Sequence, residues 1–138
     1  MASATGACLC GAVTFVVNGP LRDVIYCHCK QCRRTSGHFV AASACAKADL
    51  QLVRDEHLQW FDSSDEARRG FCGRCGSSLF WEPTFKDTMS IMAGALDDSS
   101  AVRASHHIFV TDAGAYYSLD DGLPQWEHYE KPEHANGE

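Results

Sequence analysis

The sequence has no apolar run long enough to cross a membrane, and it does not begin with the basic region and apolar stretch of a secretory signal. Basic residues are also few, with 12 lysines and arginines against 18 aspartates and glutamates, so the formal net charge is −6. General affinity for nucleic acid or for an anionic membrane needs a basic surface, which this composition does not supply. We therefore expect a cytoplasmic protein that binds neither nucleic acid nor membrane.

Low-complexity tracts, linker-like segments and internal repeats other than the cysteine pairs are absent too. A chain of 138 residues with 45% apolar residues suits one domain with a modest core. We expect a single domain over residues 1–138, with its folded part at about 8–126. The small, polar ends at 1–6 and 129–138 are expected to be loose.

Short segments of alternating apolar residues, separated by polar turns, run through most of the chain. This pattern is typical of an all-β domain. One helical turn is expected at 33–36, where Gly37 would end it. The expected strands cover 12–17, 22–26, 39–44, 50–53, 58–61, 78–82, 89–93 and 105–111.

Cysteine, in contrast, is abundant, with eight residues in this short chain. Seven of them lie in tight clusters whose members are separated by one or two residues. Disulfides between such near neighbours would close only tiny loops and stabilise little, and a reducing cytosol keeps thiols free. Clustered pairs separated by long gaps are typical of metal sites.

The segment Cys72-Gly73-Arg74-Cys75-Gly76 has the spacing of a zinc-binding turn. Its glycines, Gly73 and Gly76, permit a tight backbone that includes positive φ angles. This turn supplies two ligands and needs two more. Cys8 and Cys10 form the other pair with no third thiol nearby in sequence, so we expect these four thiolates to build a closed, structural site.

Cys27, Cys29 and Cys32 form a second cluster. Residues two apart in an extended strand point the same way, so Cys27 and Cys29 share a face that His28 does not, and a turn can bring Cys32 back to them. Three thiolates are one ligand short of a tetrahedral zinc site and would leave a position open for water or substrate.

The alternative is that a fourth protein ligand closes this second site. Cys45 is one candidate, although a lone cysteine in an apolar segment is more often a small buried hydrophobe. An iron–sulfur cluster is a further alternative, but it normally takes four thiolates in other spacings. The histidine candidates are His28, His38, His106 and His107, of which His28 is disfavoured because it faces away from the sulfurs.

Three further groups have both a structural and a functional interpretation. Arg33 and Arg34 could form a solvated edge, or could bind a substrate carboxylate in a bidentate way. His106 and His107 could act as general acid or base, but such residues are more often hydrogen-bonded within the fold. The pair at 116–117, both tyrosines, is expected to build core or to line a pocket.

Taken together, these motifs resemble a known family. Cys-x-Cys-Gly at 8–11, Cys-His-Cys-x-x-Cys-Arg-x-x-Ser-Gly at 27–37 and Cys-Gly-x-Cys-Gly at 72–76 are similar to those of the glutathione-dependent formaldehyde-activating enzyme family, also called the centromere protein V domain family. The segments at 107–109 and 122–124 resemble the family's later motifs. Where relatives often carry a tryptophan after the first of these, this chain has its tyrosine pair, which puts the choice of substrate in doubt.

The resemblance implies an Mss4-like, all-β fold of small antiparallel sheets with little helix. It implies two zinc ions per chain, a structural one on Cys8, Cys10, Cys72 and Cys75 and a functional one on Cys27, Cys29 and Cys32. Candidate substrate-binding residues are Arg33, Ser36 and His107. The implied substrates are a small thiol such as glutathione and a small aldehyde.

The sequence therefore predicts a zinc-dependent carbon–sulfur lyase or synthase of the S-(hydroxymethyl)glutathione synthase type. The alternative is a non-catalytic zinc module for interaction or scaffolding, because zinc ligands define a fold more firmly than a substrate. Chromatin binding, which the second family name suggests, is disfavoured by the acidic composition.

Overall fold

A computed structural model describes residues 4–129 of the chain. Within these residues the chain forms ten strands, one α-helix and three 3-10 helices. The predicted all-β fold of mostly antiparallel sheets with little helix is confirmed. In chain order the elements are β1 (Ala4–Ala7), β2 (Thr14–Val17), β3 (Val24–Cys27), α1 (Lys30–Ser36), β4 (Val40–Ala46), η1 (Lys47–Asp49), β5 (Leu50–Arg54), β6 (Leu58–Ser64), β7 (Ala67–Cys72), β8 (Ser78–Pro83), β9 (Thr88–Met92), η2 (Ala93–Ala95), β10 (Ala104–Ile108) and η3 (Val110–Asp112).

The chain divides into two compact units. The first unit contains the residues up to Arg22 together with Ser43–Val102, and the second contains Asp23–Ala42 together with the residues from Arg103 on. Strand β4 runs from the second unit into the first. None of the helices in the part of the chain that the structure describes is long and apolar enough to span a membrane.

The first sheet of unit 1 has the strand order β1-β2-β5. Val13, Phe15 and Val17, the alternating residues of the strand expected at 12–17, have exposed fractions of 0%, 1% and 0%, so this strand buries the predicted face. β2 pairs antiparallel with β1 on one side and with β5 on the other. The strands expected at 50–53 and 58–61 are both present, but β5 pairs with β2 whereas β6 pairs with β7.

The expectation of a loose end at 1–6 is wrong for Ala4–Gly6, which belong to β1 and pair with β2. The small residues at 4–6 had indicated a loose end. Gly6, however, is required in the strand, because a β-carbon there would collide with the ring of Phe15. Tyr129, the first residue of the other expected loose end, packs against Phe109 with ring centroids 5.1 Å apart, and residues 1–3 and 130–138 lie outside the described residues.

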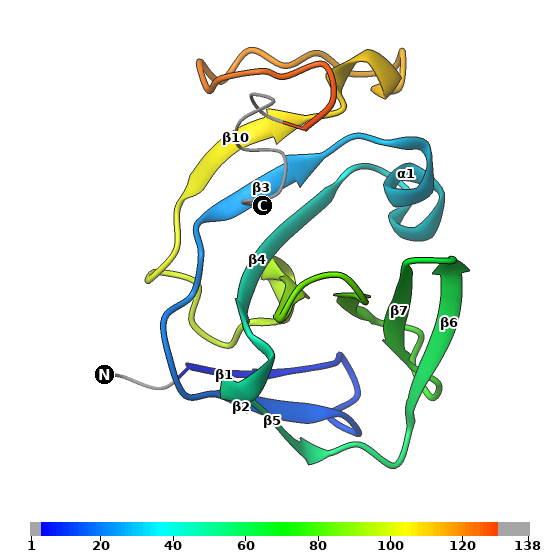
Figure 1. The fold of residues 1–138 in the computed structure, drawn as a ribbon, viewed down its shortest axis with the longest axis vertical. Coiled ribbons are helices and arrows are strands. Elements are labelled where there is room, and N and C mark those ends of the chain that lie inside the picture. The colour runs from blue at the N-terminus through cyan, green and yellow to red at the C-terminus, as the bar shows by residue number, and fades with distance from the viewer. Residues whose placement is uncertain (1–3, 130–138) are drawn as a thin grey trace. The chain divides into compact units, whose positions relative to one another are not determined.

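The second sheet of unit 1 follows the order β4-β9-β8-β7-β6, and Figure 1 shows β6 and β7 side by side. The hairpin β6–β7 pairs from Leu58↔Cys72 to Ser64↔Ala67. Its register places Cys72 at the end of β7, where the chain enters the turn at 72–76 that has zinc-binding spacing. Phe80 of β8 is fully buried and packs edge-on against Phe15, with ring centroids 5.2 Å apart, so the two sheets of this unit share one core.

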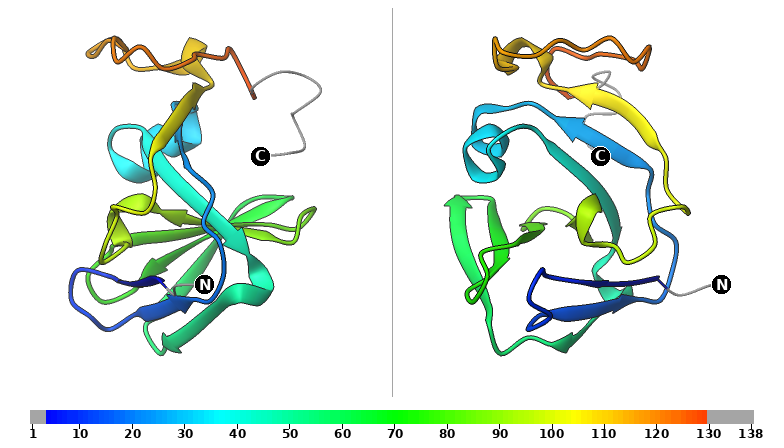
Figure 2. Two further views of the ribbon diagram at one scale, coloured as in Figure 1. Left: turned by 90° about the vertical axis from the view of Figure 1, so that its left-hand side faces the viewer. Right: turned by 180° about the vertical axis from the view of Figure 1, so that it is seen from behind.

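In unit 2, β3 pairs parallel with β10 and antiparallel with β4. Figure 2 shows β10, in yellow, alongside β3, in blue. The single α-helix α1 follows β3 and ends at Gly37, whose φ of 85° lies in the left-handed region, as expected from the sequence. The helix begins at Lys30, three residues earlier than expected, because Cys29 caps it with its sulfur.

The segment after β10 folds back along that strand. Phe109 has a φ of 56° and turns the chain at the end of β10. His107 N then donates to Pro124 O at 2.9 Å, and Trp126 N donates to His107 O at 3.0 Å. These bonds hold residues 124–126 alongside β10, where Gln125 forms a parallel bridge with His107.

Two candidate metal centres and a buried histidine pair

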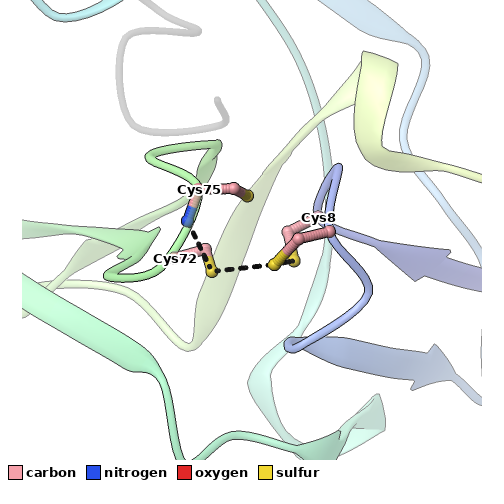
Figure 3. A group of neighbouring side chains, drawn as sticks. Cys8, Cys72 and Cys75 are labelled. Atoms are coloured by element: carbon pink, nitrogen blue, oxygen red, sulfur yellow. Dashed lines mark hydrogen bonds between the residues drawn. The ribbon is translucent and has the colours of Figure 1, made fainter.

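The first candidate centre joins two turns of unit 1. Cys8 and Cys10 lie between β1 and β2, whereas Cys72 and Cys75 lie at the end of β7 and in the turn that follows. Their four sulfurs are within 4.8 Å of one another. Figure 3 shows Cys8, Cys72 and Cys75 pointing toward a common point. The structure thus brings together the two cysteine pairs that the sequence analysis combined.

This donor set fits zinc. Ligands about 2.3 Å from a tetrahedral zinc ion lie about 3.8 Å apart. Cys10 Sγ is 3.7 Å from Cys8 Sγ and 3.8 Å from Cys72 Sγ. Backbone N–H groups point at the same sulfurs, with Val13 N 3.3 Å from Cys8 Sγ and Cys75 N 3.4 Å from Cys72 Sγ. Such donors stabilise thiolates, which are the form that binds metal.

The turn that presents Cys75 is itself shaped for this purpose. Gly76 has a φ of 81° and donates its N–H to Cys72 O at 2.8 Å, which confirms the expected need for a left-handed glycine. Gly73 has no such angle and instead lies against the side chain of Gln59. The Ser77 hydroxyl, 3.2 Å from Cys75 Sγ, lowers the pKa of that thiol to about 5.

The second candidate centre belongs to unit 2. Cys27 ends β3, Cys29 caps α1, and Cys32 lies in the first turn of that helix with its N–H 3.4 Å from Cys29 Sγ. Their sulfurs are within 4.8 Å of one another. Hydrogen bonds from Cys27 and Cys32 lower the pKa of Cys29 to about 2, and the same sharing raises the pKa of Cys27. Three soft sulfurs with one favoured thiolate, from two half-buried cysteines and the buried Cys32, are a suitable donor set for zinc.

No fourth cysteine, histidine or carboxylate joins these three sulfurs within residues 4–129. Cys45 packs in the hydrophobic core of unit 1 with an exposed fraction of 4%, and burial raises its pKa to about 11, so it is the buried hydrophobe that its context indicated. The four candidate histidines all have other polar contacts. His28 contacts His107 and Tyr117, His38 contacts Tyr116, and His106 contacts Ser105.

Of the candidate substrate-binding residues, Arg33 has the most suggestive surroundings. It is half-buried, and its Nε is buried without a hydrogen-bond partner in the described part of the chain. Arg34, next to it, is exposed. The hydroxyl of Ser36 is already engaged in the helix end, where it donates to Cys32 O at 2.8 Å and accepts from His38 N at 3.1 Å. A role for Ser36 in substrate binding stays a prediction.

His107 is buried rather than exposed to solvent. Its side chain is 2% exposed, and both ring nitrogens are engaged. Nδ1 is 2.8 Å from Nε2 of the fully buried His28, and Nε2 is 2.9 Å from Asp121 Oδ2. Burial, and then the neighbouring His107, lower the pKa of His28 to about 4. With both nitrogens taken, His107 can affect a substrate only through its neighbours, and its predicted contact with substrate stays untested.

The hydrogen bond between Tyr117 and His28 completes a row of hydrogen bonds that the sequence analysis did not find. Tyr117 Oη is 2.6 Å from His28 Nδ1, so Tyr117, His28, His107 and Asp121 are linked in a row. The neighbouring Tyr116 is 64% exposed, so of the two expected roles, core or pocket lining, it does not build core. No local sequence pattern indicates this row of hydrogen bonds, because its members are far apart in sequence. His28 and Asp121, for example, are separated by 93 positions.

Comparisons with known proteins agree with the cysteine pattern. Residues 3–112 match the family described as "Glutathione-dependent formaldehyde-activating enzyme". A Halomonas elongata protein named as a putative glutathione-dependent formaldehyde-activating enzyme is 32% identical over 101 residues, which is 67% of this chain. That match spans 64% of the relative's own length.

A solved structure shares the fold. The crystal structure of a Rhodobacter sphaeroides protein covers 88% of this chain and 98% of its own, with a TM-score of 0.58 and 24% sequence identity. At that identity the likeness concerns the fold alone.

Proposed function

This chain belongs to the glutathione-dependent formaldehyde-activating enzyme family, and on that premise we propose that it catalyses reversible carbon–sulfur bond formation between a small thiol and a small aldehyde. Glutathione and formaldehyde are the substrates that the family name indicates. The observation that carries the proposal is the difference between the two centres. One has four sulfurs, and the other has three with no fourth ligand among residues 4–129.

The four-sulfur centre is proposed as a closed structural zinc site. Its ligands come from two turns of unit 1 that are far apart in sequence, between β1 and β2 and between β7 and β8. A tetrahedral ion held by four thiolates has no position left for a substrate. Its role is therefore to hold these turns together, in the way that structural zinc contributes to folding in small domains.

The three-sulfur centre is proposed as the working zinc site, held by Cys27, Cys29 and Cys32. A zinc ion there would supply a soft Lewis acid with one open position, which lowers the pKa of a substrate thiol. The protein itself orients these ligands. β3 presents Cys27, and the capping geometry of α1 fixes Cys29 and Cys32 relative to each other.

The proposed reaction balances without a further reactant. The thiol gives its proton to solvent, and its sulfur attacks the aldehyde carbon to form the carbon–sulfur bond. The electron pair of the carbonyl π bond moves to oxygen, which takes a proton from water to give a hydroxyl group. In the reverse direction the hydroxyl loses its proton, the carbonyl re-forms and the carbon–sulfur bond breaks. Holding the two reactants together accounts for much of the expected acceleration.

Arg33 is proposed to bind a carboxylate of the thiol substrate. It follows Cys32 directly, and its buried Nε lacks a protein partner in the described residues. A buried donor without a partner is costly, and a carboxylate accepting from a guanidinium group would relieve that cost. Glutathione carries two carboxylates, which suits this group.

The test combines metal analysis with a rate measurement. We expect two zinc ions per chain, one of them removed by a mild chelator while the protein stays folded. Since formaldehyde adds to thiols without help, activity is the acceleration of adduct formation and breakdown over the uncatalysed rate, followed by exchange NMR. This acceleration should fall when the mild chelator removes the more weakly held zinc ion. Two zinc ions released only on unfolding, with no acceleration, would favour the scaffolding alternative, and iron in place of zinc would overturn the mechanism.

A further inference from the structure

Ser77 contacts both turns that carry the four-sulfur centre. It directly follows the turn at 72–76, and its backbone O accepts from Cys72 N at 2.9 Å. Its hydroxyl oxygen lies 3.2 Å from Cys75 Sγ and accepts from Leu9 N at 3.0 Å. Leu9 stands between the two cysteines of the other turn, 68 positions away. One residue outside the ligand set is therefore hydrogen-bonded to both ligand turns, which Figure 3 shows facing each other.

The bond to Leu9 is a polar contact at the tip of a turn that has little packing there. The side chain of Leu9 is 89% exposed, so it does not pack this turn against its neighbour. Cys10, the next residue, is exposed as well. The hydrogen bond from Leu9 N to the Ser77 hydroxyl therefore helps to hold the tip of this turn in place.

The atom types determine the direction of both bonds to the Ser77 hydroxyl. A hydroxyl group has one proton and two lone pairs. The N–H of Leu9 can only donate, so it takes one of these lone pairs. A cysteine that binds zinc is a thiolate without a proton, so Cys75 Sγ can only accept. The hydroxyl proton of Ser77 is therefore directed at this sulfur, because no other assignment gives each contact one proton.

The hydroxyl of Ser77 is a donor that a substitution can remove. Backbone N–H groups donate to the sulfurs of Cys8 and Cys72, and these donors stay in every side-chain variant. Backbone groups of Cys10 and Ser77 also interact with the sulfur of Cys75, and they stay as well. Replacing the hydroxyl thus changes one donor to one ligand and leaves the backbone donors in place.

We propose, building on the proposed structural zinc site, that Ser77 is a positioning residue for the four-sulfur centre. Its hydroxyl joins the two ligand turns and donates to Cys75 Sγ, and in this way it sets how tightly the centre holds zinc. Groups that hydrogen-bond to metal ligands typically account for about tenfold to hundredfold in metal affinity. Ser77 also lines a cavity of about 520 Å³, which offers space for one added methyl group.

The first test uses S77T and S77V, whose side chains have the same shape and differ in the hydroxyl group. Competition between the full chain and a chromophoric chelator measures Kd for the more tightly held zinc ion. We expect S77V and S77A to raise this Kd about tenfold to hundredfold and S77T to keep it within about threefold. S78A is the control, since Ser78 lies in β8 opposite Phe71, and it should leave Kd unchanged. An equal loss in S77T and S77V would overturn the proposal.

The second test reads the hydrogen bond to sulfur through the metal. Cobalt(II) in place of zinc gives sulfur-to-metal charge-transfer absorption, whose energy depends on the hydrogen bonds to the sulfurs. The band should lie at longer wavelength in S77V than in S77T, because a sulfur that loses a donor holds its lone pairs less tightly. The three-sulfur centre is the same in both variants and cancels in the difference spectrum. Identical band positions would contradict donation to Cys75.

The third test needs no variant to fold. In the zinc-loaded, unaltered protein, the amide proton of Leu9 should exchange with solvent more slowly than an unprotected amide, because it is bonded to the Ser77 hydroxyl. Exchange at the unprotected rate would contradict the link between the turns. Absence of tightly held zinc in the unaltered protein would contradict the proposed structural site. Tight binding with the same Kd in the unaltered protein, S77A and S77V would contradict the Ser77 inference alone.

Discussion

Nε2 of His28 lies 2.8 Å from Nδ1 of His107, although 79 positions separate the two residues in the chain. The parallel pairing of β3 with β10 brings them together, because it sets His107 opposite Tyr26 and Ile108 opposite Cys27. His28 N then donates to Ile108 O at 3.1 Å, which extends this pairing one residue past β3. The residue between two cysteines of the second centre is thereby tied to a distant strand.

Replacing Cys29 with serine should remove one zinc ion and leave the fold intact. Serine is itself a good helix N-cap, so α1 keeps its cap while the second centre loses a sulfur. We expect one zinc per chain by elemental analysis, an unchanged far-UV spectrum, and loss of the rate acceleration. C45A is the control, since Cys45 belongs to the core of unit 1 and this variant should keep two zinc ions. Full activity in C29S would contradict the proposed mechanism.

Replacing Cys72 with serine should unfold the protein, whereas C29S should leave it folded. Cys72 is fully buried and contributes to the four-sulfur centre. Structural zinc sites supply about 10–16 kcal/mol of apparent binding free energy in small zinc-finger peptides, which is comparable to the whole stability of a domain. We therefore expect C72S to be largely unfolded, as measured by circular dichroism and by its sensitivity to protease. A folded C72S with an unchanged melting temperature would show that this centre is not a structural staple.

Removing the guanidinium group of Arg33 should weaken the binding of thiols that carry a carboxylate. A hydrogen bond to a charged group contributes about 1.5–3 kcal/mol. R33A should therefore raise KM for glutathione at least about tenfold. The rate with cysteamine, which has no carboxylate, should not change. R34A is the control, because Arg34 is exposed. An equal loss with both thiols would mean that Arg33 acts on the fold of the site rather than on the carboxylate.

Two phenylalanines should differ sharply in their contribution to stability. Phe80 is fully buried against Phe15 and Trp60, whereas Phe61 is 62% exposed. F80A should lower the free energy of unfolding by about 3–5 kcal/mol, the usual cost of removing a buried phenylalanine ring. F61A should change it by less than about 0.5 kcal/mol, as surface substitutions do. Urea denaturation of the zinc-loaded protein measures both.

Replacing Gly37 should also destabilise the protein, through backbone conformation rather than through lost packing. Its φ of 85° lies in the left-handed region, and no atom lies within 4 Å of a β-carbon built there. The cost of G37A thus comes from the backbone alone and should be about 1–2 kcal/mol. Gly94 has similar open space and no positive φ, so G94A should not destabilise the protein. An unchanged stability in G37A would mean that α1 can end in another conformation.

Much of this protein could be predicted because the relevant signals are local. Val13, Phe15 and Val17 alternate, so their strand and its buried face were predictable. The same holds for the end of α1 at Gly37. The two cysteine groups were also predictable, because three sequence clusters with zinc-like spacing and one isolated thiol leave few ways to combine them. The strand β1 was missed, because small residues at 4–6 carry no pattern until Phe15 packs against them.

Apart from β1 and β7, the sequence by itself determined the strands, the helix end and the grouping of the seven clustered cysteines, since periodicity, turn chemistry and ligand spacing act over a few residues. Only the tertiary structure decided that β5 and β6 pair with different partners, and that Tyr117, His28, His107 and Asp121 form one row of hydrogen bonds. Strand pairing and buried polar contacts join residues far apart in the chain. A single residue's type shows only that it needs a partner, and the packing of the whole unit selects which partner it meets.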